Sequence, residues 1–301
     1  MGEESFQFSV TIPTYNRPQR LAALLEQLAR SEYPRDRFEV IVVDDGSVPP
    51  LSSVVEQFRD RLNLTYLRQN HGGVAMGRHT GAKAARGRFL AFTDDDCLPA
   101  ADWLPRLEAA LKSTPNSACG GRTVNGLPEN DYSTASQALN SYLNERMNIH
   151  PNGGTRFFAN NNFALPRELY LKIGGLDTAW PMCGEDRDLC ARWMDQGYPL
   201  IYAPEAIVHH THELSFARFW RQHYNYGRGA YRFRKTHASR HKAEVKLEPV
   251  SFYLKLPMAA AFAEARGARG LRIAALLIVS QLANAAGFVA ERISPKQKPP
   301  T

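Results

Sequence analysis

The chain has 301 residues, of which 44% are hydrophobic and 22% charged, and this composition excludes a disordered chain. The length fits one large domain, or one domain with an appendage. The net charge of +7 suits anionic partners such as nucleotides, anionic lipids or nucleic acid, and does not choose among them.

The first hundred residues alternate strand and helix patterns, listed here in chain order: "FSVTIPTY", "PQRLAALLEQLAR", "FEVIVVDDGS", "LTYLRQN", "GVAMGRHTGAKAARG" and "RFLAFTDDD". Pro18 suits the first turn of the first helix. The β-branched run before Asp44 is typical of a strand buried on both faces, as in a parallel sheet. This order predicts an α/β fold with an open, mostly parallel sheet and helices on both faces.

Polar clusters follow three of these strands, namely "PTYNR", "DDGS" and "TDDD". In open α/β sheets, ligands bind beyond the carboxyl ends of the strands. Three clusters on one edge therefore predict a binding site there.

The triplet Asp94, Asp95 and Asp96 directly follows an apolar strand. Neighbouring carboxylates repel by about 1 kcal/mol per pair at ~4 Å in water, so we expect a positive charge beside them. Carboxylate oxygens suit Mg²⁺ or Mn²⁺, particularly when a diphosphate completes the coordination shell. The alternative is a solvated turn, but the strand before and the helix start after favour a metal site.

The glycine-rich "HGGVAMG" lacks both the GK[ST] of a phosphate-binding P-loop and the GxGxxG of a dinucleotide site. It is otherwise typical of a loop that enters a helix. Arg78 on that helix could still reach a phosphate.

Two further motifs carry titratable groups. Glu185 and Asp186 begin a helical run, where acidic residues either complement the helix dipole or supply a general base. "IVHHTHE" contains His209, His210 and His212. HxH spacing is weak evidence for zinc, and no cysteine is near in the sequence, so we expect no structural zinc site. One histidine could join a metal bound by the aspartates.

The four cysteines contain no CxxC pair and are typical of reduced thiols in a cytoplasmic protein. The first residues, "MGEESFQFSVTIP", lack the basic start and apolar run of a signal peptide. We therefore expect a cytoplasmic protein.

Taken in order, these motifs resemble the family 2 inverting glycosyltransferases over roughly residues 7 to 212. The motifs are "SVTIPTYNRP", "VIVVDDGS", "HGGVAMGRHTGAKAARGRFLAFTDDD", "NNNFALPRELYLKIGGLD" and "GEDRDLCARWMDQGY". The resemblance implies the GT-A fold, a UDP-, GDP- or dTDP-linked sugar donor and a hydroxyl acceptor. It favours cell-envelope polysaccharide or glycolipid synthesis.

The resemblance also implies roles for individual residues. Asp96 matches the residue that holds the Mn²⁺ or Mg²⁺ ion, Asp94 lies near the donor ribose, and His209 or His210 joins the metal. The nucleotide-binding positions are Thr14, Tyr15, Arg17, Asp44, Asp45, Arg78, Asp94 and Asp95. Asp186 matches the general base that deprotonates the acceptor, and Glu185 positions acceptor or base. The donor and acceptor pockets correspond to Asn160, Asn161, Asn162 and Trp220.

Two departures from the family pattern matter. His79 stands where the family often has Asn, so that contact is not carried over. The QxxRW motif of processive members is absent around Trp220, which favours a single addition over polymerisation.

We expect a GT-A catalytic domain over 1–212, with its nucleotide part at about 1–100 and its acceptor part at about 101–212. A basic, helical extension over 213–301 would follow. Residues 273–289 are apolar but short of the ~20 that span a bilayer. The extension could pack on the catalytic domain, lie in the interface of the cytoplasmic membrane face, or span as a short hairpin.

Three other functions compete. A nucleic-acid-binding protein would suit the basic charge, but the acidic motifs at the site edge would repel phosphates, so we expect no nucleic acid. A metal-dependent nucleotidyltransferase would not account for the Asn160–Asn162 and Glu185–Asp186 motifs. An inactive family member would not need both sets of acids.

Overall fold

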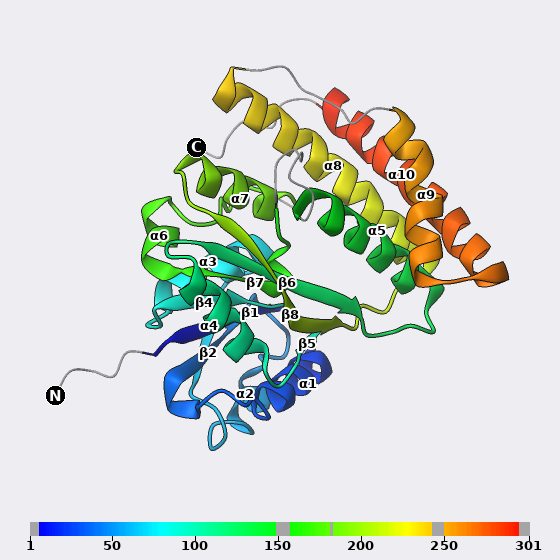
Figure 1. Cartoon of the computed structure of the whole chain (residues 1–301). Helices are drawn as coiled ribbons and strands as arrows, with labels where there is room; N and C mark the ends of the chain where they lie inside the picture. Colours follow the sequence, from blue (N-terminus) through cyan, green and yellow to red (C-terminus); the bar gives the residue numbers. More distant parts are fainter. Residues whose placement is uncertain (1–5, 149–156, 181–182, 243–249, 295–301) are drawn as a thin grey trace. The chain divides into compact units, whose positions relative to one another are not determined.

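The computed structural model describes residues 6–148, 157–180, 183–242 and 250–294 (Figure 1). It forms two compact units. The first comprises Met1–Leu127, Asn144–Pro181 and Glu185–His212, and the second Pro128–Leu143, Met182–Gly184 and Glu213–Thr301. The second unit therefore includes a segment from within the expected catalytic domain, and the two-domain division at residue 212 stays a prediction.

The first unit is built on one mixed sheet of eight strands in the order β3-β2-β1-β4-β7-β6-β8-β5. The strands are β1 (Phe8–Thr14), β2 (Phe38–Asp44), β3 (Leu64–Arg68), β4 (Phe89–Phe92), β5 (Cys97–Pro99), β6 (Ala118–Asn125), β7 (Phe163–Pro166) and β8 (Leu200–His210). The pairs β1–β2, β2–β3, β1–β4 and β6–β8 are parallel, and β4–β7, β6–β7 and β5–β8 are antiparallel. The expectation of a mostly parallel sheet is confirmed.

Strand β2 shows why helices cover both faces of this sheet. It lies between two parallel neighbours, and all its residues are buried. Val40 and Val42 enter one hydrophobic core, whereas Ile41 and Val43 enter another, because successive side chains point to opposite faces.

The helices divide between these two cores. Apolar residues of α1 (Pro18–Leu28), α2 (Ser52–Glu56) and α4 (Trp103–Ser113) pack into the first. Those of α3 (Val74–Ala84), α6 (Arg167–Lys172) and α7 (Glu185–Asp195) pack into the second. The short 3₁₀ turns η1 (Arg35–Arg37) and η2 (Asn160–Asn162) complete the unit.

The ends of the first strands carry the polar clusters. Thr14 and Asp44 are the last residues of β1 and β2, which pair with each other, and Thr93 follows β4 directly. The expected gathering of three polar motifs at one edge of the sheet is therefore confirmed.

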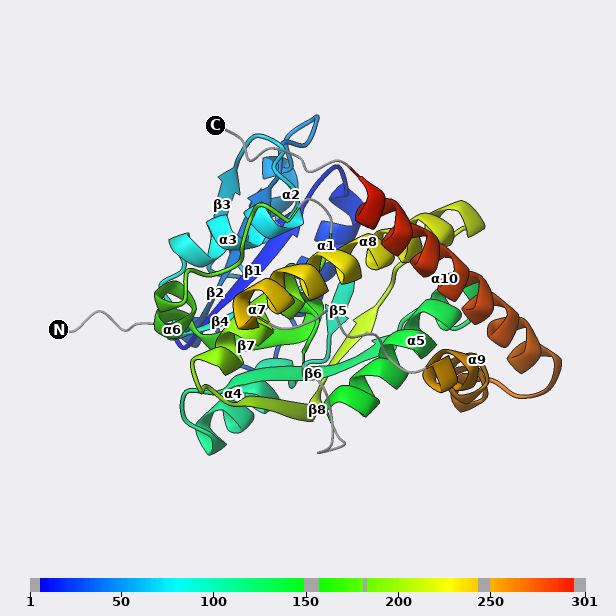
Figure 2. The same ribbon diagram turned by 90° about the horizontal axis from the view of Figure 1, so that it is seen from above.

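The second unit is helical. It comprises the first part of α5 (Asp131–Asn148) with α8 (Phe216–His241), α9 (Val250–Glu264) and α10 (Gly267–Ile293), which confirms the helical C-terminal extension (Figure 2). These helices share a core of their own, and its members are Ala135, Ala138, Leu139, Leu214, Phe219, Leu256, Ala261, Ile273, Ala274 and Leu277.

Helices α8 and α10 cross and approach closely through glycines (Figure 2). A Cβ on Gly227 would lie 1.9 Å from the carbonyl oxygen of Asn284, and one on Gly287 would lie 1.9 Å from that of Tyr224. Arg228 and Glu291 join the same two helices by an ion pair of 2.8 Å. One face of the apolar C-terminal helix is therefore covered within its own unit.

Candidate active site

Asp95 is the most enclosed of the three aspartates after β4. Thr14 Oγ1 donates to its Oδ2 at 2.8 Å, and Arg17 Nη1 lies 2.9 Å from its Oδ1. Burial raises the pKa of Asp95 to about 6, and the charge of Asp96 adds to this, although Arg17 and Thr14 act against it. This carboxylate ties the loop after β1 to the end of β4.

Asp96 turns its two oxygens in different directions. Arg20 Nη1 lies 2.9 Å from Oδ2 and Arg17 Nη1 lies 3.5 Å from it, whereas His210 Nε2 lies 3.3 Å from Oδ1. Burial alone would raise the pKa of Asp96. The hydrogen bond and charge of His210, with the charges of Arg17 and Arg20, outweigh burial and hold this pKa well below its usual range.

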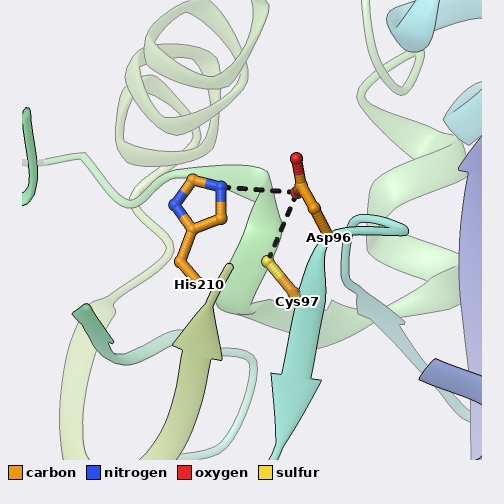
Figure 3. Close-up of side chains that lie close together, drawn as sticks. All are labelled: Asp96, Cys97 and His210. Atoms are coloured by element: carbon orange, nitrogen blue, oxygen red, sulfur yellow. Dashed lines mark hydrogen bonds and ion pairs between the residues drawn. The ribbon is translucent and has the colours of Figure 1, made fainter. Parts of the chain in front are cut away.

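Strand pairing brings Cys97 into the same cluster (Figure 3). Cys97 lies directly opposite His210 in the antiparallel pair β5–β8, and its Sγ is 4.0 Å from Oδ1 of Asp96. One ligand atom of each residue lies within 4.8 Å of the others. A carboxylate oxygen, an imidazole nitrogen and a thiol sulfur in this arrangement fit a divalent cation. No cysteine is near these histidines in the sequence, and it is the pairing of β5 with β8 that brings Cys97 beside His210.

The two histidines left open by the sequence differ in position. His210 is partly buried beside Asp96, and its Nδ1 has no hydrogen-bond partner among the described residues. His209 is exposed, and neighbouring residues on a strand point to opposite faces. His212 is buried, with its ring stacked 3.9 Å from that of His210.

Arg78 connects the aspartate triplet to the acidic start of α7. Its buried guanidinium pairs with Asp94 through Nη2 and lies 3.0 Å from Glu185 Oε1 through Nη1. Burial raises the pKa of Glu185 to about 7, and the charge of Asp186 adds to this against the charge of Arg78. Burial also raises the pKa of Asp186, against Arg187 and Arg78.

Asp186 lies in the first turn of α7, and its Oδ1 accepts the Arg187 backbone N–H at 2.7 Å. Acidic residues here also complement the helix dipole, so the structural role and the expected chemical role are compatible. Asp188 differs, because it pairs with Arg192 at 2.8 Å one turn along the helix.

Asp44 is fully buried and holds the loop that follows β2. It accepts hydrogen bonds from Ser47 N at 2.8 Å, Leu51 N at 3.0 Å and Tyr66 Oη at 2.5 Å. These bonds lower its pKa although burial acts in the opposite direction. Its observed partners give it a role in shaping the loop.

Asp45 also has protein partners for both oxygens. Oδ1 accepts from Gln69 Nε2 at 2.7 Å and from Gly72 N at 2.9 Å, and Oδ2 accepts from Gly73 N at 2.8 Å. Gly73 has φ +88°, a conformation that favours glycine, and α3 begins directly after it. The glycine-rich motif is therefore a loop entering a helix, as the sequence predicts.

Tyr15 is exposed at the end of β1, and the ring of His71 stacks on it with centroids 4.2 Å apart. His71 Nδ1 also lies 2.9 Å from Oδ2 of Asp45. An aromatic surface therefore lies beside one of the carboxylates expected at the nucleotide base.

The three asparagines of η2 have different environments. The side-chain amide of Asn162 forms hydrogen bonds within the fold. It accepts from Trp103 Nε1 at 2.9 Å and donates to the Ala206 carbonyl at 2.9 Å. Asn161 accepts from Thr123 Oγ1 at 3.4 Å. Asn160 is buried, and neither of its amide atoms has a hydrogen-bond partner among the residues that the structure describes.

Trp220 belongs to α8 in the second unit and is 38% exposed. Sequence reasoning missed Arg20 and Cys97. A signal for Arg20 existed, because it lies three residues after Arg17 at the start of a helix and so shares its face. No pattern in the sequence indicated that Cys97 belongs to the site.

Two family models each match more than half of the chain: "Glycosyl transferase family 2" over residues 9–174 and "Glycosyl transferase family group 2" over residues 92–289. The chain belongs to glycosyl transferase family 2. It is thus a glycosyltransferase, and the alternatives of a nucleotidyltransferase or a nucleic-acid-binding protein are not favoured.

Among individual relatives, the chain is 27% identical to glycosyltransferase AglE of Haloferax volcanii over 73% of this chain and 72% of that protein. It is 29% identical to the succinoglycan biosynthesis protein ExoM of Rhizobium meliloti over 69% of this chain and 68% of ExoM. The match to the poly(ribitol-phosphate) β-N-acetylglucosaminyltransferase TarS of Staphylococcus aureus is 41% identical, but it spans only 30% of this chain and 16% of TarS.

Solved structures show the fold. The mannosyltransferase PcManGT of Pyrobaculum calidifontis, in complex with GDP-Man and Mn²⁺, superposes with a TM-score of 0.67 at 19% identity, over 97% of this chain and 88% of that one. TarS 1–349 in complex with UDP gives a TM-score of 0.55 at 18% identity, over 95% and 90%. The expected GT-A fold is confirmed.

Proposed function

We propose that this protein is an inverting, divalent-cation-dependent glycosyltransferase that moves a sugar from a nucleoside diphosphate to an acceptor hydroxyl. One observation carries the proposal: a single buried arginine, Arg78, joins the aspartates after β4 to the acidic pair that begins α7. A donor site and an acceptor site must be adjacent for transfer, and the family resemblance assigns these two acidic motifs to them.

Asp96 Oδ1 and His210 Nε2 are the atoms that would hold Mn²⁺ or Mg²⁺, since they face one another at 3.3 Å. When bound, the cation supplies Lewis-acid stabilisation of the departing diphosphate. Arg17 and Arg20 lie against Asp96, and Arg78 pairs with Asp94. Electrostatic stabilisation of a developing negative charge is often the largest single contribution to catalysis.

Asp186 takes the proton from the acceptor hydroxyl as that oxygen attacks the anomeric carbon. Its raised pKa, caused by burial, makes it a stronger base than an exposed aspartate. Glu185 holds Arg78 and lies next to the base, and so positions it. Attack from the face opposite the diphosphate in a single displacement gives inversion.

Two features support a nucleotide donor. Tyr15 offers an exposed ring beside Asp45, which suits a nucleobase. Asn160 is a buried amide, and a substrate that pairs with it would remove a penalty of about 1–3 kcal/mol for its unpaired atoms. GDP-Man in PcManGT and UDP in TarS support a GDP- or UDP-linked donor in a protein of the same fold.

A polymeric or lipid-linked acceptor of the cell envelope is the acceptor class that we propose. The names of two relatives refer to succinoglycan biosynthesis and to poly(ribitol-phosphate), both polymers. The absence of the QxxRW motif supports addition of one sugar at a time.

We further propose that the second unit attaches the enzyme to the cytoplasmic face of a membrane. Helix α10 is long and apolar enough to cross a bilayer by length and composition. Its exposed large apolar residues recur at helical spacing: Leu271, Ile278, Leu282, Val289 and Ile293. Arg266, Arg272 and Arg292 are exposed near its two ends. An apolar stripe with basic ends suits the interface of an anionic bilayer.

Calorimetric titration of UDP, GDP and dTDP, each with and without Mn²⁺, tests the function. We expect one nucleoside diphosphate to bind, with higher affinity when Mn²⁺ is present. The enzyme should then hydrolyse the corresponding nucleotide-sugar slowly, and should transfer its sugar quickly once an acceptor is supplied. Failure of every nucleotide to bind with Mn²⁺ would refute the proposal.

A further inference from the structure

The cluster of Asp96, Cys97 and His210 contains a thiol that the proposed function does not use (Figure 3). We propose that Cys97 is a third protein ligand of the cation site, and that it gives this site a preference for Zn²⁺ or Co²⁺ over Mg²⁺. The inference rests on the proposed function, because it takes Asp96 and His210 as the other two ligands.

The distances suit one small ion. Bonds of about 2.0–2.3 Å to a tetrahedral zinc put neighbouring ligand atoms roughly 3.3–3.8 Å apart. Asp96 Oδ1 lies 3.3 Å from His210 Nε2 and 4.0 Å from Cys97 Sγ. Small side-chain movements would therefore bring all three atoms to bonding distance.

The sheet itself holds the three residues together. Cys97 and His210 are directly opposite in the β5–β8 pair, and opposed residues of antiparallel strands have Cβ atoms about 4.5–5.5 Å apart. The carbonyl oxygen of Asp96 accepts Thr211 N at 2.7 Å and Thr211 Oγ1 at 2.9 Å. A site on paired strands keeps its ligands in position more accurately than one on a free loop.

The arginines orient the carboxylate. Arg20 and Arg17 both lie against Oδ2 of Asp96, which leaves Oδ1 toward the imidazole and the thiol. His210 Nδ1, without a hydrogen-bond partner among the described residues, can carry the ring proton while Nε2 faces the ion. One oxygen, one nitrogen and one sulfur thus face a common point.

The mixture of ligands decides the metal. Thiolate and imidazole favour zinc and its chemical neighbours, whereas magnesium and manganese favour oxygen ligands. On binding, the S–H bond of Cys97 breaks, a sulfur–metal bond forms, and the proton passes to solvent. Three protein ligands leave a position open for an external ligand, as in catalytic zinc sites.

The absorption spectrum of bound Co²⁺ shows directly whether a cysteine sulfur is bonded to the metal. We expect Co²⁺ added to the full chain to give a near-ultraviolet sulfur-to-cobalt charge-transfer band. Cys97→Ser should lose this band but still bind Co²⁺ through Asp96 and His210, and Asp96→Asn should lose both. Cys119→Ser is the matched control, because Cys119 is an equally buried free thiol on β6, and it should keep the band.

A second measurement tests the metal preference by competition between Zn²⁺ and Mn²⁺, and it does not depend on enzyme activity. Zn²⁺ should displace Mn²⁺, observed by its spin resonance, at lower concentration from the wild type than from Cys97→Ser. If circular dichroism shows that Cys97→Ser does not fold, Cys97→Ala replaces it in both measurements. The wild type alone also decides the matter, since bound Co²⁺ without a charge-transfer band, or no Co²⁺ binding at all, overturns the inference.

The outcomes separate the inference from the function. If the wild type binds a nucleoside diphosphate with Mn²⁺ and transfers sugar, but shows no sulfur band, Cys97 is not a ligand and the proposed function stands. If no nucleotide binds with any of these metals but Co²⁺ gives the sulfur band, the proposed function fails and Cys97 is still a metal ligand. A band that survives in Cys97→Ser also overturns the inference.

Discussion

Nη1 of Arg78 lies 3.0 Å from Oε1 of Glu185, a residue 107 positions further along the chain. The other terminal nitrogen of the same guanidinium pairs with Asp94. Both partners of Arg78 are carboxylates of the candidate site, and Arg78 is itself buried, so this arginine couples the two halves of the site.

Replacing Arg78 should therefore affect stability and binding together. Arg78→Ala leaves Glu185 buried without its cation, and breaking such a pair costs about 3–5 kcal/mol. Urea unfolding should show a loss of this order, and nucleotide affinity should fall. Arg78→Lys should recover only part of both, because an ammonium does not reproduce the planar guanidinium with its separate nitrogens.

The control is Arg106→Ala, which removes an exposed arginine from a surface pair with Asp102. It should leave the free energy of unfolding and the nucleotide affinity close to those of the wild type. Equal effects of the two alanine variants would contradict a coupling role for Arg78.

The neighbouring histidines of β8 allow a matched comparison. His210→Ala should weaken the dependence of nucleotide affinity on Mn²⁺, since His210 Nε2 lies 3.3 Å from Asp96, whereas the exposed His209→Ala should not. Calorimetry of the nucleotide with and without Mn²⁺ measures both. A larger effect at His209 would show that the wrong histidine has been assigned.

The order of strands and helices could be predicted because local patterns determine it. The β-branched run of β2 required burial on both faces, and Thr14, Asp44 and Thr93 then fell at one edge for topological reasons alone. The resemblance to the family supplied the roles of Asp96 and Asp186, which no spacing rule would have given.

The partners of these residues could not be predicted in the same way. Cys97 meets His210 through the register of β5 on β8, which depends on how strands distant in sequence pair. Asp44 was expected at the nucleotide and Asn162 in the donor and acceptor pockets, and the structure adds that both form hydrogen bonds within the fold. A motif identifies the residue type, whereas the surrounding packing decides which of its atoms remain available.

The exposed stripe of α10 predicts vesicle binding. The wild type should sediment with anionic vesicles, less so at high salt because screening weakens the attraction of its basic residues. Ile278→Glu with Leu282→Glu should abolish sedimentation, because each buried aliphatic side chain contributes about 1.5 kcal/mol or more, so a loss of at least ~tenfold is expected.

The control introduces the same two charges elsewhere. Val48 and Leu171 are exposed apolar residues of the first unit, and Val48→Glu with Leu171→Glu should sediment as the wild type does. If the two double variants behave alike, net charge rather than the stripe governs binding. If the wild type ignores vesicles, the membrane proposal is wrong.

The acidic pair predicts the pH dependence of transfer. Burial raises the pKa of Glu185 to about 7, with the charge of Asp186 adding to it, and burial raises that of Asp186 as well. A base works only when deprotonated, so kcat/KM should rise with pH through the pKa of Asp186, which burial places above that of an exposed aspartate. Glu185→Gln removes the neighbouring charge, so the rising limb should move to lower pH. If kcat/KM of the wild type already rose near pH 4, the burial of Glu185 and Asp186 would be contradicted.

The mechanism depends most on Asp186. An acceptor hydroxyl is a poor nucleophile until a carboxylate takes its proton, and general-base catalysis contributes about 10²- to 10⁴-fold in rate. Asp186→Asn keeps the shape of the side chain and removes its basicity. We therefore expect transfer to fall by at least ~10²-fold, while nucleotide and Mn²⁺ affinities stay near wild type, because no described contact joins Asp186 to Asp96.

Asp96→Ala should show the opposite pattern, because its main loss should be in metal-dependent nucleotide affinity. Measuring calorimetric affinity and transfer rate on both variants separates the two roles. Asp188→Asn is the matched control on the same helix, because Asp188 already pairs with Arg192 and should contribute to stability rather than to transfer. A near wild-type rate for Asp186→Asn would move the base to Glu185, whose pKa is also raised by burial, and Glu185→Gln would then have to abolish transfer.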